Sequence, residues 1–117
     1  GVTWTFVMND ADFLGYDSQN GRGLQMGKKA DPASSISLST DGISGTIKKM
    51  VINTSGASGT DATLVVKVGG SEFGSPVKTT NSAADYVFAG SASGKIELNW
   101  TLSAAAVYIK SIAVYTE

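Results

Sequence analysis

Apolar and polar residues alternate in short runs along most of the chain. In 3–8 the large side chains of Trp4, Phe6 and Met8 share one parity and the threonines share the other. This period of two is that of a half-buried β-strand. The same kind of run recurs at 23–29, 35–39, 46–54, 62–68, 71–73, 85–89, 95–100 and 105–116. The pattern therefore predicts about eight or nine strands and no helix.

Two of these segments change parity part-way along. The apolar set shifts across Lys48-Lys49 in the first and across Lys110-Ser111 in the second. We expect a β-bulge at each place, because one extra residue in a strand shifts the side chains that follow it. Gly69-Gly70 lies between two strand segments and predicts a tight hairpin, since the turns that suit a hairpin require positive φ.

Short strands joined by such turns predict an all-β fold. We expect one domain over residues 1–117, an antiparallel two-sheet sandwich that is jelly-roll-like rather than immunoglobulin-like. A chain of this length buries a core without disulfides or metal. Strand parity predicts the core residues, which are Phe6, Ile36, Leu38, Ile47, Leu64, Val66, Phe88, Ile96, Leu98, Ile109 and Val114. We also interpret Trp4 and Trp100 as core rather than as a ligand platform.

The chain contains no histidine and no cysteine, which removes the most versatile acid–base, thiol and metal-ligand chemistry. Its ten acidic residues lie mostly in turns or on polar strand faces, where carboxylates are ordinarily solvated, so a catalytic carboxylate pair is not expected. There is no phosphate-binding glycine loop and no nucleophile elbow. We therefore predict that the protein is not an enzyme and has no catalytic residues.

Charge and composition limit the classes of partner that the protein is expected to bind. The net charge is −1, and neither sign is clustered, whereas nucleic acids and anionic membranes bind concentrated basic patches. No apolar run approaches the roughly 20 residues of a membrane-spanning helix, so membrane insertion is not expected either. Few charges with many hydroxyl residues are common in extracellular β-modules, and this composition is also compatible with other compartments. The strand pattern begins almost at Gly1, without a methionine, and suggests a domain excised from a longer exported protein.

The segment 9–21 is unusually rich in side-chain chemistry, and we interpret it as a loop. It is longer than the two to five residues that usually connect a hairpin. A ring can stack on the flat C–H face of a sugar, while amide, carboxylate and guanidinium groups bond its hydroxyls. The candidate ligand-binding residues are Phe13, Tyr16, Asp17, Gln19, Asn20 and Arg22. The alternative is that Phe13 and Tyr16 fold back and cap the end of the core.

The same segment offers oxygen ligands for calcium in Asn9, Asp10, Asp12 and Asp17. Calcium takes about six to eight oxygen ligands, but the spacing does not match the EF-hand loop. A solvated acidic turn is the alternative. We expect no cofactor and assign no metal ligand, and bound calcium is the lesser hypothesis.

Four stretches carry a resemblance to a known group of proteins: GLQMG at 23–27, SISLST at 35–40, GTIKKMVINTSGA at 45–57 and AVYIKSIAV at 106–114, with a looser match at 4–6. They resemble β-sandwich modules of secreted and surface proteins of gut Bacteroidetes. Such modules accompany bacterial Ig-like domains, carbohydrate-active enzymes or secreted nucleases. The resemblance implies an exported sandwich similar in shape to carbohydrate-binding jelly rolls, and it assigns no ligand residue.

These observations predict a non-catalytic carbohydrate-binding accessory module of a secreted or cell-surface protein. Its expected partners are a glycan or polysaccharide and the neighbouring domains of the parent protein. The alternative is a structural spacer or adhesion module without a small-molecule ligand. Exposure of Phe13, Tyr16 and Arg22 around one concavity would favour the binding module.

Overall fold

The computed structural model describes residues 2–10, 14–17, 21, 23–28, 33–57, 61–102 and 106–117. In these residues the chain forms eleven β-strands and no helix. The strands are β1 (Thr5–Asn9), β2 (Leu14–Asp17), β3 (Gly23–Gly27), β4 (Ser35–Thr40), β5 (Ile47–Gly56), β6 (Ala62–Val68), β7 (Ser71–Glu72), β8 (Val77–Lys78), β9 (Ala84–Ala92), β10 (Ile96–Leu102) and β11 (Ala106–Thr116). The described part of the chain has no helix long and apolar enough to cross a membrane.

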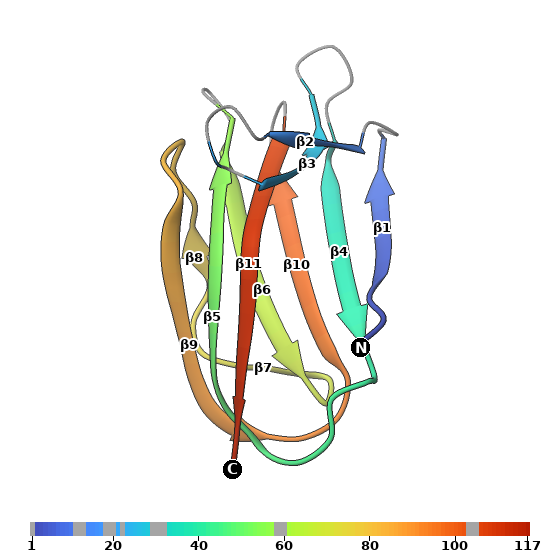
Figure 1. Ribbon diagram of the computed structural model, residues 1–117, viewed down its shortest axis with the longest axis vertical. Coiled ribbons are helices and arrows are strands. Elements are labelled where there is room, and N and C mark those ends of the chain that lie inside the picture. The colour runs from blue at the N-terminus through green and yellow to red at the C-terminus, as the bar shows by residue number, and fades with distance from the viewer. Residues whose placement is uncertain are drawn as a thin grey trace.

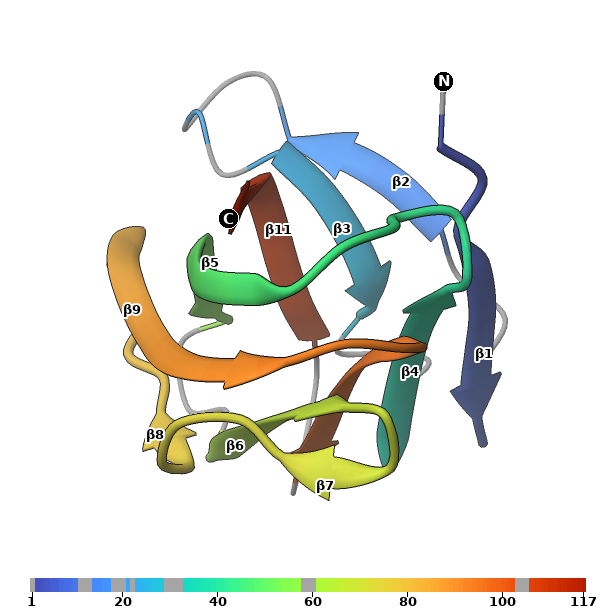
Figure 2. The same ribbon diagram turned by 90° about the horizontal axis from the view of Figure 1, so that it is seen from below.

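The strands form two antiparallel sheets packed face to face (Figure 1). The first sheet has the order β1-β4-β10-β6-β7, and β8 also pairs with β6. The second sheet has the order β2-β3-β11-β5-β9. Seen from below, β1 and β2 lie at one side of the sandwich and β9 and β8 at the other (Figure 2). The predicted all-β antiparallel sandwich is confirmed.

All nine predicted strand segments are strands, but the count is too low because two more exist. The interpretation of 9–21 as a loop is wrong at Leu14–Asp17, which forms β2 and pairs with β3 along its whole length. Gly15 and Asp17 have low strand propensity, which hid the alternation of Leu14 and Tyr16. The second addition, β8, is a two-residue strand beside β6.

Both predicted bulges are confirmed. The register between β5 and β9 shifts between Ile47 and Lys49, and that between β11 and β5 shifts between Ile109 and Ser111. The hairpin is also confirmed, since Gly69 and Gly70 connect β6 to β7 with φ of 64° and 90°. Positive φ at both central positions is what a type I′ turn requires.

The core lies between the two inner faces. Nine of the eleven predicted core residues are buried, whereas Phe6 and Val114 are only partly buried. Phe6 lies on β1, an edge strand of the first sheet, and Val114 lies near the end of β11. Of the two tryptophans, Trp4 is partly buried and Trp100 is fully buried. The indole N–H of Trp100 has no hydrogen-bond partner among the described residues.

Leu64 and Val65 provide a test of this packing, because they are neighbours on opposite faces of β6. Leu64 is fully buried and Val65 is not. We expect Leu64→Ala to lower the free energy of unfolding by about 2–5 kcal/mol through the lost contacts and the cavity. Val65→Ala is expected to cost less than about 1 kcal/mol. Urea unfolding of both variants measures the difference, and equal losses would contradict the assigned faces.

Candidate functional site

Tyr16 is the candidate ring that the structure describes, and it is widely exposed. It lies on β2, the outer strand of the second sheet, opposite Leu24 of β3. Cross-strand partners share a face of the sheet, and Leu24 packs against the core. Tyr16 therefore lies on the inner face of the second sheet. Because β2 is the outermost strand, the other sheet does not cover the Tyr16 side chain, and its exposed fraction is 74%. This exposure argues against the capping alternative for Tyr16.

Of the other predicted ligand-binding residues, the structure describes only the backbone of one. Asp17 ends β2 opposite Gly23, and nothing is described of its side chain. The candidates Phe13, Gln19, Asn20 and Arg22 lie outside the described residues. Leu14, two positions before Tyr16 on the same face, is 53% exposed and extends the open surface beside the ring. The interpretation of these residues as one binding site stays a prediction.

The point at which the segment 9–21 leaves β1 is firmly held. Asp10 has a φ of 66°, a left-handed conformation that aspartate tolerates better than most residues. Its carboxylate accepts a hydrogen bond from the Ser34 hydroxyl, and the Ser34 amide donates to the Asn9 carbonyl at 3.0 Å. The Asn9 side-chain amide donates to the Ser35 hydroxyl at 2.6 Å. The end of β1 is thereby fixed to the start of β4.

These contacts bear on the calcium hypothesis. Asn9 and Asp10 already use their side chains in bonds to Ser35 and Ser34. Among the described residues no three acidic side chains come together as a metal site would need. Asp12 lies outside the described residues, as does the side chain of Asp17. Calcium binding stays a hypothesis that depends on those two groups.

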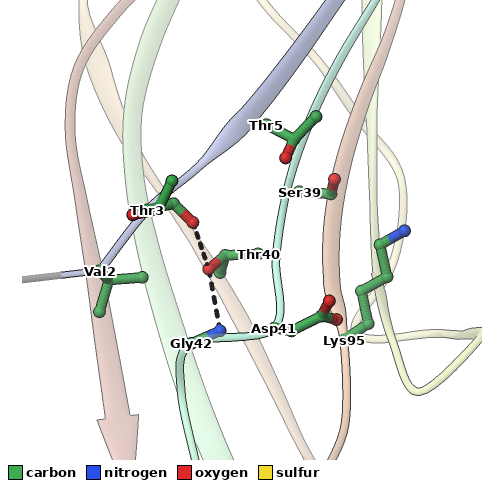
Figure 3. A pocket seen from close by; sticks show the side chains of 8 residues that line it. All are labelled: Val2, Thr3, Thr5, Ser39, Thr40, Asp41, Gly42 and Lys95. Atoms are coloured by element: carbon green, nitrogen blue, oxygen red, sulfur yellow. Dashed lines mark hydrogen bonds between the residues drawn. The ribbon is translucent and has the colours of Figure 1, made fainter.

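A polar hollow that the sequence did not reveal lies at the far end of β4 (Figure 3). It has a volume of about 500 Å³. Its walls come from the segment before β1, from β1 itself, from the end of β4 and the turn after it, and from the residue before β10. The lining residues are Val2, Thr3, Thr5, Ser39, Thr40, Asp41, Gly42 and Lys95.

Hydrogen bonds fix the rim of this hollow. The Thr40 hydroxyl donates to the Thr3 carbonyl at 2.7 Å and accepts from the Gly42 amide at 3.0 Å. A side chain at Gly42 would crowd Val2, because its Cβ would lie 3.1 Å from Val2 Cγ1. The chain before β1 therefore lies tightly against the turn that follows β4.

The hollow also carries two free charges. The Asp41 side chain points from the turn after β4 toward Lys95, the residue before β10 (Figure 3). Neither side chain has an ion-pair or hydrogen-bond partner in the part of the chain that the structure describes. A carboxylate accepts hydrogen bonds and an ammonium donates them, so this surface can bond a ligand of either polarity. Asp41-Gly42 looks only like a turn in the sequence, which is why the site was missed.

The hollow is continuous with the outer face of the first sheet. Thr5 and Ser39 are register partners on that face, and Glu97 of β10 pairs with Ser39. Further along β4 the outward residues are Ser37 and Ser35. The face therefore presents small hydroxyl side chains along β4 and offers no aromatic ring in the described strands.

The sequence matches no protein-family model and no curated protein. The fold, however, is similar to solved carbohydrate-binding modules. TmCBM61, solved in complex with β-1,4-galactotriose, aligns with a TM-score of 0.62 at 17% identity, over 97% of this chain and 88% of that one. The CBM36-1 domain of a multidomain xylanase from the hindgut metagenome of Trinervitermes trinervoides aligns with a TM-score of 0.54 at 16% identity, over 98% of each chain.

A third solved structure is the carbohydrate-binding module CBM36 in complex with calcium and xylotriose. It aligns with a TM-score of 0.50 at 19% identity, over 95% of this chain and 99% of that one. At these identities the likeness concerns the fold. The chain has the β-sandwich architecture found in carbohydrate-binding modules.

Gly23 positions β3, and therefore β2 and Tyr16, against β11. Its φ is 86°, and a methyl group there would overlap the carbonyl oxygen of Ile109. Gly21 has a similar φ of 66° but open space around it. We expect Gly21→Ala to cost about 1–2 kcal/mol from backbone strain alone, and Gly23→Ala to cost a further 1–3 kcal/mol, roughly, from the overlap. Chemical denaturation of the pair checks this, and equal costs would be evidence against the close approach.

Calcium binding is tested by thermal unfolding. We expect the same midpoint with millimolar calcium as with a chelator, because the described acids form no cluster. An ion that binds only the folded state would raise the midpoint by mass action. A calcium-dependent rise that is lost in Asp12→Asn would show that the 9–21 segment completes a site.

Proposed function

We propose that this chain is a non-catalytic carbohydrate-binding module and that its ligand is a glycan or polysaccharide. The observation that carries the proposal is the 74% exposed ring of Tyr16 on the edge strand of the sandwich. In the wider proposal the module is accessory to a secreted or cell-surface protein, of the kind that the resemblance to modules of gut Bacteroidetes implies, and contacts that protein's neighbouring domains.

The placement of Tyr16 suits stacking on a sugar. The ring is held by a strand, because Tyr16 pairs with Leu24 and Leu14 pairs with Met26. A ring presented from a paired strand loses little conformational freedom when a ligand packs on it, and it supplies a large contact area. The hydroxyls of the sugar would be bonded by Asp17, Gln19, Asn20 or Arg22, with Phe13 as a second ring.

The fold supports the same class of ligand. TmCBM61 and CBM36, which share the architecture, were solved with β-1,4-galactotriose and with xylotriose. These two sugars are therefore the first probes for this chain. The calcium in the CBM36 structure is the reason for including calcium in the binding buffer of one arm of each experiment.

Replacing Tyr16 is the direct test. A glycan array that includes β-1,4-galactotriose and xylotriose identifies the ligand, and calorimetry then measures its affinity. We expect Tyr16→Ala to weaken binding by about 1–3 kcal/mol, the scale of a buried aromatic contact, and to leave the unfolding midpoint unchanged.

Tyr115→Ala is the matched control. Tyr115 is also exposed, at 48%, and lies near the end of β11, with Lys49 Nζ 4.4 Å from the ring centroid. The C-terminus, which directly follows β11, and the strand β2 lie at opposite ends of the molecule (Figure 1). This variant should bind like the unmodified protein. A blank array, or a loss of stability in Tyr16→Ala without a loss of binding, would favour the structural spacer instead.

A further inference from the structure

We propose that the hollow at the end of β4 is a second saccharide site, which holds one sugar unit by its hydroxyl groups and works independently of Tyr16. The ligand class rests on the proposed function, whereas the site itself rests on the geometry around Asp41 and Lys95. The sugar is bonded by polar groups alone, without a stacking ring.

The hollow is preorganised. Thr40 joins its two walls, donating to Thr3 at 2.7 Å and accepting from Gly42 at 3.0 Å. Both roles of the Thr40 hydroxyl are therefore filled within the protein, and it acts as a brace rather than as a ligand group. A ligand that enters does not have to order this backbone, which lowers the entropic cost of binding.

The free groups match a polyhydroxylated ligand. Asp41 can accept two hydrogen bonds from neighbouring sugar hydroxyls, and Lys95 can donate to hydroxyl or ring oxygens. Thr5 and Ser39 contribute hydroxyls of either polarity on the adjoining strands. Because neither charged group has a partner within the described protein, a sugar that binds here breaks no bond inside the protein, and its hydroxyls replace water as the hydrogen-bond partners.

The lining also disfavours other ligands. Among its residues only Val2 has a side chain that is entirely apolar and large, and it is 44% exposed. Sites for drug-like or lipid ligands are lined mainly by apolar and aromatic groups. The paired presence of one carboxylate and one ammonium gives no net attraction for a polyanion. A neutral or weakly charged sugar unit fits these properties, and the volume of about 500 Å³ is of the size that small-molecule sites have.

The two sites lie apart on the molecule. Ser35, at the start of β4, is bonded to the end of β1 from which the 9–21 segment departs, and Asp41 follows the other end of β4. Asp41 follows Ser35 by six positions along an extended chain, which corresponds to roughly 20 Å. A single polysaccharide chain that engaged both sites would gain avidity, because the second contact is intramolecular.

The test is a ¹⁵N–¹H NMR titration of the whole domain with the methyl glycosides of β-galactose, β-xylose and β-glucose, and with β-1,4-galactotriose. We expect the amides of Ser39, Gly42 and Lys95 to shift with at least one of these sugars. Asp41→Ala and Lys95→Ala should each weaken that interaction by roughly tenfold, which is the effect of losing one hydrogen bond to a charged group.

Control variants separate this effect from a change of overall charge. Glu72→Ala removes a carboxylate and Lys110→Ala an ammonium, both exposed and outside the hollow. Neither should change the shifts at Ser39 and Gly42. Tyr16→Ala should also leave them unchanged and should abolish shifts at Gly15 and Leu24.

The outcomes distinguish the two proposals. Shifts confined to Gly15 and Leu24 would overturn the second site and leave the proposed function standing. Shifts at Ser39 and Gly42 that survive Asp41→Ala and Lys95→Ala would also overturn it, since the charged groups would then be idle. Shifts at the hollow alone would support it and remove Tyr16 from the binding surface. An absence of shifts anywhere with all the sugars would overturn both.

Discussion

The register of β10 between β4 and β6 is the constraint on which the rest of the sandwich depends. β10 pairs along its length with a strand on each side, and its inward residues include Ile96, Leu98 and Trp100. Because side chains alternate with a period of two, a slip by one residue would place Glu97 and Asn99 in the core. The same parity assigns Ser39 and Thr5 to the outer face. Burial on one side of the sheet thus decides which chemistry faces the solvent on the other.

The sequence was informative wherever this burial is strong. Both bulges were visible as parity changes, because Met50 and Ile112 must return to the inner face after the extra residue. β2 was not visible for the opposite reason. It is an edge strand of four residues whose two apolar side chains, Leu14 and Tyr16, are exposed, so no burial enforces the alternation. Partial exposure of Phe6 has the same origin, since β1 is also an edge strand.

The two candidate ligand surfaces, the one around Tyr16 and the hollow at the end of β4, differ in how much of each the sequence predicts. Tyr16 could be singled out because an aromatic residue among amides and carboxylates is unusual for a connecting segment. The hollow is built from positions near 3, 41 and 95, which no spacing motif relates. Only the pairing of β1 with β4 and of β4 with β10 brings Thr5, Asp41 and Lys95 to one place. Residues far apart in the sequence meet at the ends of strands because of the order in which the strands pair. A local sequence pattern does not reveal that order.

The two tryptophans differ in solvent exposure, so their fluorescence responds differently to a quencher in the solvent. Trp100 is sealed in the core, so collisional quenchers in water do not reach it, and its emission follows only global unfolding. Trp4 is partly exposed and lies between Thr3 and Thr5, two residues that line the hollow. Quenching of the native fluorescence therefore reports on the start of β1, where Trp4 lies, against a constant background from Trp100. A ligand that covers this part of the surface would change the quenching of Trp4, so no added label is needed.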